Sequence, residues 1–122
     1  MSQTRILQFT ILATCLLGCS NSLPAPANSE IAVESLKKAL SAWQSGASAE
    51  SLQPMSPPIY FNDQLWKNGH QLSNFTMDEG SANGQGWNCE ATLEVQIDGK
   101  QKKVKVNYQI DTSPVIVIVQ QP

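Results

Sequence analysis

The side chains best suited to chemistry are three cysteines and one histidine: Cys15, Cys19, Cys89 and His70. A structural zinc site needs about four Cys, His or carboxylate ligands, which a single histidine and a cysteine on an apolar stretch do not provide. Nucleophilic catalysis would require His70 beside a serine or cysteine, and no nucleophile elbow or cysteine-protease signature is present. We therefore expect a non-enzymatic protein without catalytic residues, metal or cofactor.

Cys19 occupies a distinctive position at the end of an apolar run. The run extends from Ile6 to Gly18, follows Arg5, and ends in Leu16-Leu17-Gly18-Cys19. It is shorter than the roughly 20 residues that a membrane-spanning helix needs. A positive residue followed by a short apolar run is typical of a secretory signal peptide.

Leu16, Leu17, Gly18 and Cys19 resemble the lipobox of bacterial lipoproteins, in which an aliphatic and a small residue precede the lipidated cysteine. The resemblance implies recognition of Leu16, Leu17 and Gly18 by the signal peptidase. It also implies a diacylglyceryl group on the Cys19 thiol and an acyl chain such as palmitate on its amine. Two acyl chains suffice for stable membrane attachment. The alternative A-x-A cleavage site, 25–27, lies ten residues beyond Leu17.

Cleavage before Cys19 would divide the chain into three parts. Residues 1–18 are the signal peptide, residues 19–28 are a lipidated, proline-containing tether, and residues 29–122 form one small domain. The resemblance implies attachment at the cell envelope, on the periplasmic side. Ser20, where inner-membrane lipoproteins of enteric bacteria carry Asp, favours the outer membrane.

The net charge of the chain bears on its class of partner. The chain has 8 Lys and Arg against 10 Asp and Glu, a net charge of −2. This acidic balance gives no electrostatic footprint for nucleic acid.

Cys89 is the only cysteine in residues 29–122, so the domain cannot form an internal disulfide. We expect Cys89 to be a small buried hydrophobe, with a reactive or intermolecular thiol as the alternative.

The first expected element of the domain is a helix that begins near Ser29. Either Asn28 or Ser29 can cap it, and Gly46 is suited to end it. Helical spacing aligns four apolar residues into one stripe: Val33, Leu36, Leu40 and Trp43. We expect this stripe to cover a sheet.

The clearest strand is Trp87–Asp98, in which apolar and polar residues alternate strictly. The pattern repeats at Val104–Ile110, and Asp98-Gly99 predicts a hairpin between the two strands. A two-residue turn would pair Leu93 with Val104, whereas a four-residue loop would pair Val95 with Val104. Both registers keep the apolar faces together.

Shorter elements are expected between the helix and this hairpin. Residues 48–52 predict one helical turn, and Asn62 can cap a short helix that Gly69 ends. Residues 72–77 predict a strand, and Asp78–Gly86 predicts a long loop that matches no calcium-binding spacing.

The segment Val115–Val119 is an uninterrupted apolar run. Exposed on both faces and at an edge, it would be an aggregation hazard. We therefore expect protection by the short strand Ile59–Phe61, by loops or by a second subunit.

The fold class predicted is α+β, with an N-terminal helix packed on a curved antiparallel β-meander of three to five strands. This arrangement is similar to cystatin-like and NTF2-like half-barrels. The domain also resembles small uncharacterised lipoproteins of planctomycete-type bacteria. The residues that carry the second resemblance are Ala42-Trp43, Gly46, 56–59, Trp66, Gly69, Cys89 and 112–115. It implies no particular activity.

The function predicted is a lipid-anchored interaction module that binds an unknown envelope protein through a sheet edge or the concave sheet face. An edge strand could also pair with a second copy of the chain. The alternative is a small-ligand binder with a pocket between helix and sheet, lined by Trp43, Trp66, Trp87 and Tyr108.

Overall fold

The computed structural model describes residues 27–122, so the predicted signal peptide, Cys19 and most of the predicted tether lie outside the described residues. The main helix is α2, Ser29–Gln44. The Asn28 side chain caps it by accepting a hydrogen bond from the Ile31 N–H, and Gly46 follows its end with a positive φ of 92°. The expected helix is confirmed, with Asn28 rather than Ser29 as its cap.

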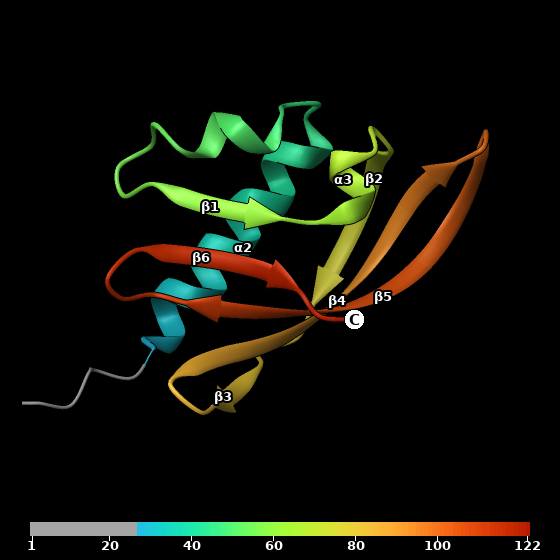
Figure 1. Ribbon diagram of the computed structural model, residues 1–122. Coiled ribbons are helices and arrows are strands. Elements are labelled where there is room, and N and C mark those ends of the chain that lie inside the picture. The colour runs from blue at the N-terminus through green and yellow to red at the C-terminus, as the bar shows by residue number, and fades with distance from the viewer. Residues whose placement is uncertain (1–26) are drawn as a thin grey trace, which may run out of the picture.

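Within residues 27–122, six strands form a single mixed sheet in the order β1-β6-β5-β4-β2, with β3 paired to β4 (Figure 1). Short helical elements precede and follow β1. The bounds are η2 Ala49–Leu52, β1 Ile59–Asn62, α3 Gln64–Lys67, β2 Gln71–Met77, β3 Ser81–Asn83, β4 Gly86–Ile97, β5 Lys100–Asp111 and β6 Ile116–Gln120.

The β4–β5 hairpin has the register of a two-residue turn. Leu93 pairs with Val104 and Ile97 with Lys100, so the four-residue loop was wrong. Asp98 and Gly99 both have positive φ, 53° and 76°, as a type I′ turn requires. This turn keeps the apolar faces of both long strands on the same side of the sheet.

The prediction of an antiparallel meander of three to five strands was wrong in part, because the described residues form six strands and β1 pairs with β6 in parallel. Ile59 lies opposite Ile116 and Phe61 opposite Ile118. This pairing confirms that the Ile59–Phe61 segment protects the apolar run of β6, which therefore lies inside the sheet. The parallel pairing joins segments more than 50 residues apart, which no local pattern in the sequence encodes.

The loop predicted over Asp78–Gly86 was also wrong in part, because Ser81–Asn83 forms strand β3 against the start of β4. Three contacts hold this region. The Trp87 indole N–H donates to the Glu79 carbonyl at 3.0 Å, and the Asp78 carboxylate accepts from the Glu90 N–H at 3.0 Å. Gln85 accepts from the Ala27 N–H at 2.8 Å, which ties the first described residue to the sheet.

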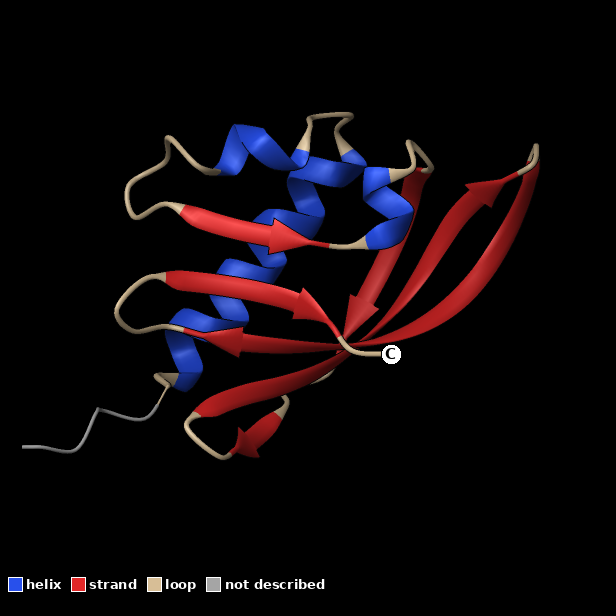
Figure 2. Ribbon diagram, in the orientation of Figure 1, coloured by secondary structure: helices blue, strands red, loops and turns tan. Residues whose placement is uncertain are grey.

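The sheet curls into a half-barrel, and α2 lies against its inner side (Figure 2). The apolar side of α2 and the inner face of the sheet form one core, which includes Leu36, Leu40, Leu93, Tyr108 and Ile118. Within residues 27–122, no helix is long and apolar enough to cross a membrane.

Candidate functional site

Two of the four predicted pocket residues, Trp43 and Trp66, stack against each other at the end of α2. Their ring centroids are 5.3 Å apart and their planes differ by 7°. The Trp43 indole donates to the His70 carbonyl at 2.8 Å, and the Trp66 indole donates to the Ala47 carbonyl at 3.1 Å. Both indole N–H groups are thereby used within the fold, and both rings are held in place.

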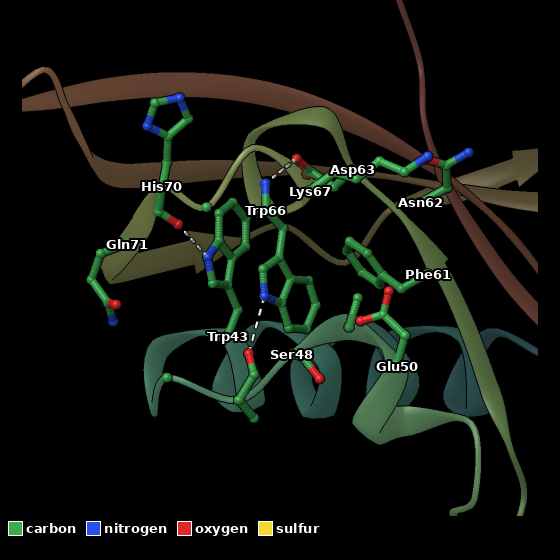
Figure 3. Close-up of a pocket in the computed structure, with 14 residues that line it drawn as sticks. Trp43, Ser48, Glu50, Phe61, Asn62, Asp63, Trp66, Lys67, His70 and Gln71 are labelled. Carbon is green, nitrogen blue, oxygen red and sulfur yellow. Dashed lines mark hydrogen bonds between the residues drawn. The ribbon is translucent and has the colours of Figure 1, made fainter.

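The stacked indoles form the floor of an open pocket of about 560 Å³ (Figure 3). Phe61 packs edge-on against Trp66 and supplies a further apolar wall. The polar side chains around the pocket come from η2 and the residue before it, the end of β1, α3, and the start of β2 with the residue before it: Ser48, Glu50, Asn62, Lys67, His70 and Gln71. An aromatic floor with a polar rim could hold a small ligand.

Tyr108 lies behind this pocket and is fully buried. Its hydroxyl donates to the Asp63 carboxylate, whose other oxygen accepts from the Leu65 and Trp66 N–H groups at 2.8 and 3.3 Å. Burial, reinforced by the neighbouring Asp63 carboxylate, raises the pKa of Tyr108 well above its usual range. Tyr108 therefore serves as a neutral anchor for α3.

Asp63, and not the predicted Asn62, caps the short helix α3. Both residue types are good helix caps, and the two are adjacent in the sequence. The choice depends on Tyr108, 45 residues away, whose hydroxyl needs a buried acceptor. No local signal in the sequence contains that requirement.

Trp87 lies apart from the other three aromatic residues. It borders a separate depression beside the start of α2, together with Val33, Glu34 and Gly80. The structure therefore brings Trp43 and Trp66 together, with Tyr108 behind them, and leaves Trp87 at another surface.

Cys89 is completely buried on the inner face of β4, which confirms the packing prediction. Its thiol lies 3.1 Å from the Asp78 carbonyl oxygen and 3.3 Å from the Asp78 carboxylate. Burial first, and the Asp78 carboxylate second, raise the pKa of Cys89 to about 12. The thiol is therefore protonated at neutral pH, unlike a nucleophilic cysteine.

A second candidate site is the outer edge of β5; the sequence predicted binding through a sheet edge but did not identify the strand. Pairing with β6 covers only Tyr108–Asp111. Lys100–Val106 is paired with β4 on one side and has no strand partner on the other among the described residues. In Figure 1 this part of β5 is the outermost ribbon at the right.

The hairpin register indicates which backbone groups face this edge. In an antiparallel pair, alternate residues exchange both hydrogen bonds with the partner strand, and the residues between them point away. The pairs Lys100–Ile97, Lys102–Val95 and Val104–Leu93 bond to β4, since a two-residue turn is closed by such a pair. Gln101, Lys103 and Lys105 therefore direct their N–H and C=O groups to the free edge.

The free edge is also basic. Lys100, Lys102, Lys103 and Lys105 are all exposed. The Lys103 ammonium lies 4.0 Å from Glu94, but its side chain remains 75 % exposed. Four lysines within six residues were the available sequence signal; on their own they are also typical of a solvated strand.

No family model, curated protein or solved structure matches this chain. Functional inference therefore depends on the pocket at Trp43 and Trp66 and on the free edge of β5. The predicted lipidation residues Leu16, Leu17, Gly18 and Cys19 lie outside the described residues.

Proposed function

We propose that this protein is a lipid-anchored component of a bacterial cell envelope whose domain binds another envelope protein through a sheet edge. Leu16-Leu17-Gly18-Cys19 supports lipidation at Cys19 and attachment on the periplasmic side, with the outer membrane favoured by Ser20. We propose no catalytic activity, cofactor or nucleic-acid binding for it.

The observation that carries the binding proposal is the unpaired edge of β5 at Lys100–Val106. Unpaired strand edges readily accept another chain, and proteins usually cover them or keep them short. The other apolar strand segment, β6, lies between β1 and β5 in this domain. The free part of β5 is thus an accessible edge that is bonded to β4 alone.

Two experiments test the two parts of this proposal. Cys19→Ser should release the protein from membranes, whereas the wild-type chain should stay with them after a high-salt wash. Crosslinking in intact envelopes should capture a partner with the wild-type chain and lose it with Lys103→Pro, because proline removes an edge N–H. Membrane retention of Cys19→Ser would refute the anchor, and an unchanged crosslink with Lys103→Pro would refute the edge.

The cystatin-like or NTF2-like assignment is likewise our proposal. It is supported by the one long helix among the described residues, α2, which lies against the inner side of a curled sheet. The parallel strand β1 is a departure from a simple meander. A likeness of this kind concerns the fold and carries no function.

The pocket at Trp43 and Trp66 favours a second candidate function, the binding of a small ligand. Its volume of about 560 Å³ lies in the range of small-molecule sites. A ligand that binds there should raise the melting temperature and change the tryptophan fluorescence. His70→Ala should reduce that shift, while Lys103→Pro should leave it unchanged because β5 does not line the pocket.

A further inference from the structure

We infer that the free edge of β5 binds an extended acidic segment of a partner protein as an added strand. This inference rests on the proposed interaction function and specifies the partner's chemistry. The edge consists of Gln101, Lys103 and Lys105, whose outward N–H and C=O groups have no backbone partner among the described residues. Main-chain hydrogen bonds to such an edge supply affinity in strand addition, and side chains supply specificity.

In the neighbouring part of β5, the same edge is hydrogen-bonded to the C-terminal segment of this chain. The Asn107 backbone faces the same edge as that of Lys103 and Lys105, because alternate residues of a strand face the same neighbour. Its carbonyl accepts a hydrogen bond from the Gln121 N–H at 2.8 Å. Beyond it, Gln109 pairs with Val119 in β6. An added strand over Lys100–Val106 would continue this ladder from the point where the chain's own last strand stops.

The side chains along the edge favour a partner strand in which acidic and apolar residues alternate. Lys103 and Lys105 lie on the outer face of the sheet, and Val104 is half-buried on the inner face. On the neighbouring strand β4, Lys105 lies opposite Thr92, and only Lys103 lies opposite an acid, Glu94, so these two lysines are not neutralised pair by pair. A strand with acidic residues on one face and apolar residues on the other would complement both faces.

A second copy of this chain is a poor occupant of the edge. Two β5 edges paired about Lys103 would place that lysine opposite its own copy, and like charges directly opposite each other destabilise a sheet. The lysines thus discriminate against self-pairing and against neutral strands while favouring an acidic one.

The location of the edge suits a partner held away from the lipid. Ala27, where the described chain begins, is hydrogen-bonded to Gln85, next to the start of β4. The free edge flanks the opposite end of β4, which has 12 residues and therefore extends about 40 Å. In Figure 1 the tip of the β4–β5 hairpin and the start of α2 lie at opposite sides of the molecule.

The test uses the full acylated chain in detergent micelles and a labelled peptide of alternating glutamate and valine, long enough to span Lys100–Val106. Fluorescence anisotropy should show binding of this peptide and none of its lysine–valine counterpart. Lys103→Gln keeps the edge N–H and should weaken binding about threefold, as one exposed ion pair does. Lys103→Pro also removes the N–H and should weaken binding about tenfold further, since a main-chain bond is lost.

Lys37→Gln with Lys38→Gln is the matched charge control, because both lysines are exposed on α2. This double variant should bind the acidic peptide within about twofold of wild type. A second measurement does not depend on the folding of the variants. Adding the acidic peptide to the wild-type chain should slow hydrogen exchange at the Gln101, Lys103 and Lys105 amides.

Three results would overturn the inference. The first is failure of the acidic peptide to bind, and the second is equal affinity in Lys103→Pro and Lys103→Gln, which indicates attraction by charge alone. The third is slow hydrogen exchange at the edge amides without peptide, together with a dimer that forms as the protein concentration rises. That result would assign the edge to a second copy of the chain. The acidic peptide could fail to bind while the crosslink in envelopes is still lost in Lys103→Pro. That combination would refute an acidic partner segment but leave the proposed function standing.

Discussion

The most consequential single residue of the domain is Asp63, a carboxylate only 3 % exposed. It receives two backbone N–H groups from α3 and the hydroxyl of Tyr108, so it joins the short helix to the centre of the sheet. α3 in turn carries Trp66, the floor of the pocket. Loss of this carboxylate should therefore affect both stability and the pocket.

Asp63→Ala should lower the free energy of unfolding by about 2–3 kcal/mol, because it removes a helix cap and leaves a buried hydroxyl without its acceptor. Tyr108→Phe should cost about 1–2 kcal/mol, since Asp63 keeps its other two hydrogen bonds. Urea denaturation measures both. Asn62→Ala is the matched control and should change stability by less than about 0.5 kcal/mol; a larger effect there would contradict the assignment of Asp63 as the cap.

The Cys89 thiol should resist alkylation in the native chain at pH 8 and react rapidly in denaturant. Its pKa is about 12 in the fold and 9.0 ordinarily. Because the folded value is the higher one, the thiol's stabilising contribution is complete below pH 9 and is lost as the pH rises toward 12. Mass spectrometry of a Cys15→Ser, Cys19→Ser chain after iodoacetamide treatment isolates this site.

The pH dependence provides an independent check. Between pH 9 and pH 11 the unfolding free energy of wild type should fall more steeply than that of Cys89→Ala, which has no thiol to ionise. Parallel curves, or rapid native alkylation, would indicate that the thiol is accessible and weakly perturbed.

At the scale of elements, strand β5 has two different environments along its length. Tyr108–Asp111 lies between β4 and β6, whereas Lys100–Val106 is bonded to β4 alone. Period-two alternation and Asp98-Gly99 predicted the hairpin but left two registers open, of which the structure has the one set by a two-residue turn. They could not predict where β6 ends along β5, because that depends on the parallel pairing of β6 with β1.

Hydrogen exchange in the isolated full chain should alternate along the free part of β5. The Lys102 and Val104 amides, which bond to β4, should exchange slowly, while the Lys103 and Lys105 amides should exchange rapidly. Gln109, which faces β6, is the internal control and should be slow. Uniform protection from Gln101 to Lys105 would mean that the edge is already occupied.

At the scale of the whole molecule, the point where the chain joins the domain would orient the domain on a membrane if Cys19 carries the proposed lipid. The Ala27 N–H bonds to Gln85, and the Asn28 N–H donates to the Thr112 hydroxyl at 3.0 Å. Seven residues separate Cys19 from Ala27 in the sequence. Even fully extended, such a segment spans only about 25 Å, so a lipid at Cys19 would keep the Gln85 end near the bilayer.

A fluorophore at Gln85→Cys should be quenched more strongly by spin-labelled lipid than one at Gln101→Cys, in the acylated chain on vesicles. Both positions are exposed, and Cys89 is buried and does not compete for the label. Equal quenching, or stronger quenching at position 101, would contradict this orientation and the separation of the basic edge from the lipid.

The sequence alone determined the elements whose signals are local. The helix follows from its apolar spacing, with its cap narrowed to Asn28 or Ser29. The hairpin follows from alternation and from Asp98-Gly99, with its loop narrowed to two or four residues. The burial of Cys89 follows from its place on an apolar face. The lipobox resemblance likewise depends on four adjacent residues and remains a prediction.

Only the tertiary structure decided the contacts between distant segments. These are the parallel β1–β6 pair, the choice of Asp63 over Asn62, the separation of Trp87 from Trp43 and Trp66, and the free edge of β5. Each depends on which backbone or side-chain groups are brought together once the sheet curls around α2. Local propensity carries no information on such pairings, because the partners are set by burial of the whole core.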